Sequence, residues 1–273
     1  MASVKNYLQN KALERIPAPL MENGGKGLVV AIDKAVETRW DDAIKRAAEA
    51  EGVTMEEKIA SASKAISKEL VSLGAATGAA AAAPGLGTAA AVSMLVAEVG
   101  WFGLRASDMI MTIGALYGRT DSTPEERRAW VLSVLAFGEQ AAEEFAVLVG
   151  NIDSEVNLRG GKVGAMMAGI MQGDRATVEA LRRVNTRLAS RVIAKYGSRK
   201  GVLMIGRLIP FGVGAAVGGV ANWGLSRAIV THARRFFDSY PMAGLDSPPP
   251  PLNSQRSAIQ PPAPKALPVP KDD

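Results

Sequence analysis

The chain has 273 residues and a net charge of +5, and 48% of its residues are hydrophobic, 22% charged and only 5% aromatic. This length allows one or two domains with a sizeable core. Cysteine is absent and histidine occurs once, which excludes disulfides, thiolate metal sites and a cysteine nucleophile, and would leave a zinc ion with carboxylates alone. We therefore predict no cofactor and no metal site.

Three parts of the chain differ in composition. Residues 1–29 are predicted to form a partly helical N-terminal extension, and they contain no apolar run typical of a signal peptide, so we expect a cytoplasmic protein. Residues 30–240 are predicted to form one helical domain. Residues 241–273 contain ten of the 15 prolines and predict a disordered tail with polyproline tendency.

Within the helical part, apolar residues recur at the spacing of an α-helix. A capping box follows the first such segment, with Thr54 as the N-cap and Glu57 bonding back to it. The segment before the capping box is predicted to bury one helix face. Its apolar residues recur every four positions: Ile32, Val36, Trp40 and Ile44.

A second helix start is predicted at Thr123, where an N-cap is followed by Pro124 at the first helical position and by a glutamate at the third. The apolar residues behind it predict one long amphipathic helix that passes through Gly138 to Leu148. No strand-like alternation holds over five residues, so we predict an all-α multi-helix bundle. A further helix after Gly173 is predicted to turn four apolar residues inward: Leu181, Val184, Leu188 and Val192.

Two segments, residues 70–97 and 208–226, carry no charge and are rich in alanine and glycine. Each contains a Gly-x-x-x-Gly spacing, at Gly74 and Gly78 and at Gly214 and Gly218, which lets helix backbones approach closely, as in a glycine zipper. We expect two helical segments that either pack on each other in a soluble core or enter lipid as a hairpin. The positions assigned to this packing or insertion are Gly74, Gly78, Gly85, Gly87, Pro210, Gly212, Gly214, Gly218 and Gly219.

A basic stripe precedes the second of these segments, at Arg183, Arg187, Arg191 and Lys195. Apolar residues run beside it, so the helix is basic and amphipathic, a pattern that anionic membrane surfaces attract. A nucleic acid is not favoured as the partner, because the stripe lacks stacking aromatics apart from Tyr196 and no DNA- or RNA-binding motif is present.

Two groups of residues resemble the EcsC protein family, and together they span roughly residues 30–240. The family is bacterial, predicted to be helical and without an established activity, and it is named for a member encoded beside an ABC transporter. The first group is Ala106-Ser107-Asp108-Met109, Ile113, Tyr117-Gly118, Pro124, Arg127 and Val134–Gly138. The second group is Ile209–Gly219, Asn222 and His232–Phe237.

The resemblance implies structural roles for five positions in particular. These positions are Asp108, Tyr117, Gly118, Pro124 and Asn222. Asp108 is expected to act as an N-cap or as a buried hydrogen-bonding residue, and Met109 stands where the family usually has an aliphatic residue.

The single histidine, His232, lies among cations near a helix end, where we expect its proton affinity to fall and its role to be packing.

Three functional hypotheses follow. The first is a non-enzymatic, membrane-associated protein at the inner face of the membrane, held to anionic lipid by the basic stripe or bound to a membrane protein. The second is a soluble helical scaffold that offers its Pro-rich tail to a protein partner. The third and weakest is a hydrolase in which Asp108 works with another carboxylate in a cleft. Oligomerisation is left open.

Overall fold

The structure is a computed structural model, and it describes residues 18–81, 88–156, 175–198 and 215–239. Within these ranges every regular element is helical, as the sequence predicts. The elements in chain order are α2 (Ala18–Thr38), α3 (Trp40–Ala48), α4 (Met55–Ala81), α5 (Thr88–Leu116), α6 (Pro124–Phe137), the 3-10 turn η1 (Gly138–Gln140), α7 (Ala141–Val156), α9 (Arg175–Tyr196) and α11 (Ala215–Ser239).

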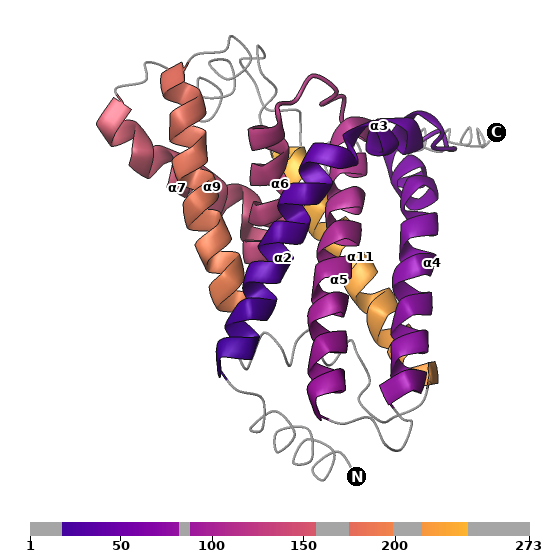
Figure 1. Ribbon diagram of the computed structural model, residues 1–273. Helices are drawn as coiled ribbons and strands as arrows, with labels where there is room; N and C mark the ends of the chain where they lie inside the picture. The colour runs from indigo at the N-terminus through magenta and orange to yellow at the C-terminus, as the bar shows by residue number, and fades with distance from the viewer. Residues whose placement is uncertain (1–17, 82–87, 157–174, 199–214, 240–273) are drawn as a thin grey trace, which may run out of the picture.

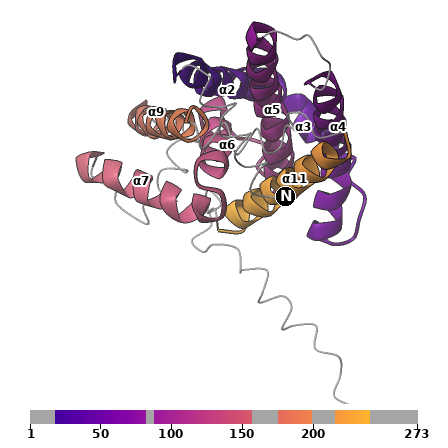
Figure 2. The same cartoon turned by 90° about the horizontal axis from the view of Figure 1, so that it is seen from below.

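The long helices pack as a bundle around α6 (Figures 1 and 2). Viewed along the bundle, α6 lies inside a ring formed by α2, α5, α11, α7 and α9. Most of α6 is therefore buried on all sides, with Trp130, Val131 and Leu132 at 0% exposure. On the other side of the bundle, α11 packs against both α4 and α5.

Both predicted helix starts are confirmed. The Thr54 hydroxyl accepts from the Glu57 amide at 3.2 Å, and the Glu57 carboxylate accepts from the Thr54 amide at 3.0 Å, which completes a capping box. At α6, the Thr123 hydroxyl accepts from the Glu126 amide at 3.2 Å, and Pro124 occupies the first turn. The four inward-facing residues expected on α9 are also fully buried.

Two predicted continuous helices are interrupted. The apolar face that runs from Ile32 through Trp40 is buried, but α2 ends at Thr38 and α3 begins after Arg39. The single helix expected from Thr123 to Leu148 is wrong, because Gly138 adopts φ +63° and separates α6 from α7. Apolar spacing did not reveal either interruption, since the buried face continues across both.

The packed part of the chain starts earlier than residue 30. Helix α2 begins at Ala18 and packs along α5. Leu28 and Val29 are buried in the core, although the sequence assigned them to the extension. Residues 1–17 and the Pro-rich residues 241–273 lie outside the described ranges.

Candidate functional site

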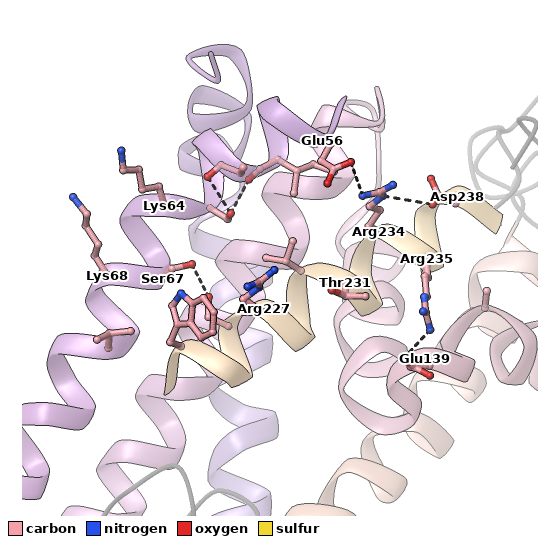
Figure 3. A pocket seen from close by; sticks show the side chains of 18 of the residues that line it. Glu56, Lys64, Ser67, Lys68, Glu139, Arg227, Thr231, Arg234, Arg235 and Asp238 are labelled. Atoms are coloured by element: carbon pink, nitrogen blue, oxygen red, sulfur yellow. Dashed lines mark hydrogen bonds and ion pairs between the residues drawn. The ribbon is translucent and has the colours of Figure 1, made fainter. Parts of the chain in front are cut away.

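An open groove runs between α4 and α11 and is closed at one end by η1 and the start of α7 (Figure 3). Its volume is about 1310 Å³, and both hydroxyl and charged side chains line it. The two helices run in opposite directions, so that Glu56 near the start of α4 faces Arg234 near the end of α11. The groove therefore has one end near η1 and another near the charge-free halves of α4 and α11.

The charges at the η1 end of the groove neutralise one another. Arg234 lies 3.5 Å from Glu56 and 4.0 Å from Asp238, and Arg235 lies 2.8 Å from Glu139. Figure 3 shows these pairs along the last turns of α11. Glu143, which also lines this end, is exposed and has no ion pair among the described contacts, so the unpaired charge here is negative.

The other end of the groove has a cationic character. Lys64 and Lys68 project side by side from α4, one turn apart, and both are exposed (Figure 3). Arg227 faces the groove from α11, and its guanidinium lies 4.7 Å from the centre of the Trp223 ring. Among the residues that the structure describes, no carboxylate pairs with Lys64, Lys68 or Arg227.

A pair of serine hydroxyls joins the two helices between these cations. Ser67 Oγ of α4 lies 2.5 Å from Ser226 Oγ of α11, and either hydroxyl can donate. Ser226 is buried at 1% exposure, whereas Ser67 is half-buried. We refer to Lys64, Lys68, Arg227 and this hydroxyl pair as the cationic site.

The basic stripe predicted on α9 does not form a continuous cationic surface. Arg183 and Arg187 are exposed, but Arg191 lies 3.7 Å from Glu144 and its guanidinium lies 5.0 Å from the Phe137 ring. These contacts direct the C-terminal half of the stripe towards α6 and α7.

Lys195 is turned inward, towards the end of α6. Its ammonium group donates to the carbonyls of Leu135 and Ala136 at 2.8 and 2.9 Å, where they lack helical partners. Burial lowers the pKa of Lys195 from its ordinary value of 10.5. Lys195 thus stabilises the C-terminal end of α6.

Asp108 lies in the middle of α5 with 0% exposure, so it is a buried hydrogen-bonding residue and not an N-cap. Its carboxylate accepts from Arg39 Nε at 2.6 Å and from Arg105 at 2.9 Å, and Arg46 lies 3.9 Å away. The Asp108 hydrogen bond is the main cause that raises the pKa of Arg39. Arg39 is the residue between α2 and α3, so its ion pair with Asp108 holds the junction of these two helices against α5.

The Asp108 cluster does not extend into the groove. Arg105 also pairs with Glu69 of α4, and Arg39 and Arg46 approach Asp42 at 3.7 and 4.0 Å. Asp108 is absent from the groove lining. The groove therefore gives no support to the hydrolase hypothesis at Asp108.

Three further family positions lie at or beside the ends of α5 and α6. Gly118, at φ +78°, ends α5 in a Schellman motif, in which its amide bonds Ala115 O and the Arg119 amide bonds Gly114 O. The hydroxyl of Tyr117 donates to Asp238 at 2.5 Å, and burial first, then this carboxylate, raises the pKa of Tyr117. Pro124 begins α6.

His232 packs against the interruption at Gly138, where an added Cβ atom would come within 3.1 Å of the imidazole. The pKa of His232 is lowered from its ordinary value of 6.5, as the sequence predicts. Burial is the main cause; Glu139 opposes it, and Lys195 and Arg235 lower the pKa further.

We expect the free energy of unfolding to fall between pH 7 and pH 5, and the fall to be smaller in His232→Gln. The unfolded imidazole takes up a proton near pH 6.5, whereas the folded one does so only at lower pH, so acid favours the unfolded chain. Urea unfolding of both proteins at several pH values measures the difference. The carboxylates titrate in both proteins, so equal slopes would contradict the lowered pKa.

Several predicted positions lie outside what the structure describes. Among the described residues, no group of three His, Asp or Glu side chains lies close enough to hold a metal ion. Gly74 and Gly78 lie in α4, and Gly218, Gly219 and Asn222 lie in α11, but their contacts are not described. Gly85, Gly87, Pro210, Gly212 and Gly214 lie outside the described residues.

The sequence analysis missed the cationic site, although a signal for it was present. Lys68 and Glu69 stand just before the first charge-free segment, and Arg227 stands just after the second. Cations and a tryptophan at the borders of apolar segments are typical of membrane interfaces. The longest run of basic residues lies on α9, and the fold uses part of it for internal contacts.

Function has to be inferred from this geometry. The resemblance to the EcsC family remains an expectation from the sequence. The chain matches no protein-family model, no curated protein and no solved structure.

Proposed function

We propose that this protein is a non-enzymatic, membrane-associated protein that contacts the cytoplasmic face of an anionic membrane through one end of its bundle. The observation that carries the proposal is the convergence of three charge-free helix ends. The C-terminal end of α4 and the N-terminal ends of α5 and α11 all lie at the lower end of the bundle in Figure 1. We call this region the apolar end.

The length of the apolar end suits one leaflet of a bilayer. Residues 70–81 of α4 and 215–226 of α11 are charge-free helix for about 18 Å each, and residues 88–97 of α5 for about 15 Å, at 1.5 Å per residue. Half of the hydrocarbon core is about 15 Å thick. Insertion to this depth would place the first charged residues at the headgroups.

The residues that border the apolar end suit the headgroup region. Lys68 and Glu69 precede the charge-free part of α4, and Arg227 follows that of α11. Trp223 lies one turn before Arg227 and is 52% exposed. Tryptophan and long cationic side chains favour the membrane–water interface because one part is apolar and the other is polar. Each cation near an anionic leaflet contributes roughly 1 kcal/mol.

The neighbouring helix limits how much of the bundle could be immersed. Helix α2 starts at the same end, but it carries Glu22 and Lys26 in its first turns. The proposed contact is therefore confined to α4, α5 and α11. Within the described residues, no helix is both long enough and apolar enough to cross a bilayer.

The experiment is co-sedimentation of the full chain with phosphatidylglycerol-containing and pure phosphatidylcholine vesicles, at low and high salt. We expect binding to the anionic vesicles that only partly reverses in salt, because screening weakens the ion contacts but not the apolar contact. Ala81→Glu, which adds a charge at the C-terminal end of α4, is expected to lower the partition coefficient at least tenfold, since a charge in hydrocarbon costs about 2.5 kcal/mol or more.

The matched control is Val53→Glu. Val53 is 95% exposed in the connection before α4, at the opposite end of that helix. It makes the same charge change on a surface that the proposal leaves in water, so vesicle binding should stay within twofold. Equal losses in the two variants, or no vesicle binding by the unmodified protein, would overturn the proposal and direct attention to protein partners of the Pro-rich tail.

A further inference from the structure

We propose that residues 241–251 of this chain dock in the groove between α4 and α11, running back along α11 from Ser239 towards Trp223. The occupant of the groove is then the start of the chain's own Pro-rich tail and not a separate protein. This inference goes beyond the proposed membrane contact, because it uses only the groove and the sequence that follows α11.

The tail starts at one end of the groove. Asp238 and Ser239, the last two residues of α11, both line the groove. Asp238 is held in place, since it accepts a hydrogen bond from the Tyr117 hydroxyl at 2.5 Å and lies 4.0 Å from Arg234. Pro241 follows shortly after the helix and disfavours its continuation. The chain therefore leaves α11 beside the groove.

The groove offers a continuous track back along α11. Side chains that line it recur every three or four residues, so they lie on one face of the helix. Figure 3 shows the last four of them in order along α11. These lining residues are Trp223, Arg227, Thr231, Arg234 and Asp238.

The length of the tail brings its first proline run to the tryptophan of the groove. Trp223 lies 16 residues before Ser239, about 24 Å along α11 at 1.5 Å per residue. A polyproline helix advances about 3.1 Å per residue, so roughly eight residues cover this distance and about two or three more reverse the chain direction. Residue 249 or 250 then lies level with Trp223, within Pro248–Pro251. Proline-rich segments dock against aromatic side chains, and the Trp223 ring is 52% exposed.

The same register matches the charges of the tail and the groove. Asp246 is the only charged residue between residues 240 and 255. Arg227 lies about 18 Å from the end of α11, which places it level with residue 247 or 248 and within a side chain's reach of Asp246. Among the described residues, no carboxylate pairs with Arg227. The first charge of the tail therefore arrives beside an unpaired cation of opposite sign.

The chemistry and size of the groove also suit a proline run. Proline has no amide hydrogen, and a polyproline helix has no internal hydrogen bonds, so its carbonyls need external donors. The lining supplies hydroxyls from Ser67 of α4 and Thr231 of α11, as well as the Arg227 guanidinium. The groove volume of about 1310 Å³ exceeds the roughly 300–1,000 Å³ of small-molecule pockets, which favours an extended peptide over a small ligand.

The first test is disulfide cross-linking of the full chain. The sequence contains no cysteine, so two introduced thiols form the only disulfide within a chain. Thr231 is exposed in the groove about 12 Å from the end of α11, level with residue 245 or 246 of the docked tail. Under mild oxidation, Thr231→Cys/Leu245→Cys should form this disulfide at least tenfold faster than a control pair.

The control pair is Gln140→Cys/Leu245→Cys. Gln140 is exposed and absent from the groove lining. It follows Glu139, whose carboxylate lies 2.8 Å from Arg235 in the last turns of α11, so an undocked tail would meet it readily. Equal rates for the two pairs would overturn tail docking. Disulfides that form only between chains would also overturn it and indicate docking by a second copy.

The second test measures the accessibility of Trp223 by acrylamide quenching of tryptophan fluorescence. Trp223→Phe is the blank for the three other tryptophans. Pro249→Gly/Pro250→Gly should raise the quenching constant of Trp223 about twofold, because it removes the two rings expected there and increases the entropy of the free tail. Pro261→Gly/Pro262→Gly makes the same change farther along the tail and should leave this constant unchanged. Equal quenching in the two double variants would overturn docking on Trp223.

Docking covers Trp223, which borders the apolar end, so the tail and the membrane would compete for this residue. This consequence alone rests on the proposed function. Thr231→Cys/Leu245→Cys should bind phosphatidylglycerol-containing vesicles less tightly when oxidised than when reduced. Vesicle binding without the preferred disulfide would overturn tail docking and leave the proposed function standing. The preferred disulfide without vesicle binding by either form would overturn the proposed function alone.

Discussion

Asp108→Asn is expected to lower the free energy of unfolding by about 3 kcal/mol, because it leaves the buried ends of three arginines without their shared carboxylate. The carboxylate is fully buried, whereas the side chains of Arg39, Arg46 and Arg105 remain 30%, 22% and 21% exposed. This partial exposure keeps the loss near the lower limit for a buried ion pair. Urea unfolding followed by far-UV circular dichroism measures it.

Two variants separate this effect from a general loss of charge. Asp33→Asn breaks the bidentate pair with Arg128, but Asp33 is 38% exposed, so the loss should be below about 1 kcal/mol. Adding Arg39→Gln to Asp108→Asn should cost less than Arg39→Gln does alone, since the two residues act as a pair. Additive losses would contradict the proposed coupling.

Phe237→Ala is expected to lower the free energy of unfolding by about 3 to 5 kcal/mol, which is typical of a large buried ring. Phe237 is 1% exposed, and its ring centre lies 5.2 Å from both Trp130 and Phe236 and 5.7 Å from Tyr117. These rings join α5, α6 and α11. Urea unfolding provides the free energy, and near-UV circular dichroism should show loss of the fixed aromatic packing.

Phe137→Ala is the comparison for Phe237→Ala. Phe137 is only partly buried, so its truncation should cost less than half as much. Gly114 of α5 packs against the same rings. A Cβ atom added there would lie 2.9 Å from the Phe237 ring and 2.8 Å from the Trp130 ring. Gly114→Ala should cost about 1 to 3 kcal/mol alone and less when combined with Phe237→Leu.

The helices of this protein could be predicted from local sequence, because their signals act over a few residues. Thr54 and Thr123 cap helices through amides three positions ahead. The interruption at Gly138 could not be predicted in this way, since glycine also occurs inside helices and apolar spacing does not report its φ of +63°. The neighbour of Gly138 in the fold, His232 of α11, is also distant along the chain.

The candidate site was harder to predict for the same reason. Its spacing assigns Lys195 to a basic helix face, but in the fold its ammonium group donates to the carbonyls at the end of α6. Lys68 and Arg227 lie far apart in sequence and share a groove only because α4 and α11 pack together. Sequence periodicity assigns a residue to a helix face but does not show which neighbour covers that face.

The pairing of α4 with α11 also affects how the protein is made. Ser67 and Ser226 are 159 residues apart, so the partner of α4 does not exist when α4 leaves the ribosome. At about 5 to 20 residues per second, synthesis of the intervening chain takes roughly 10 to 30 s. During that interval the face of α4 that packs on α11 lacks its native partner, and so do the rings of Tyr117 and Trp130, which pack on Phe237 in the fold. Apolar surface that stays exposed during synthesis favours aggregation, so this chain is most prone to aggregate before α11 has been made.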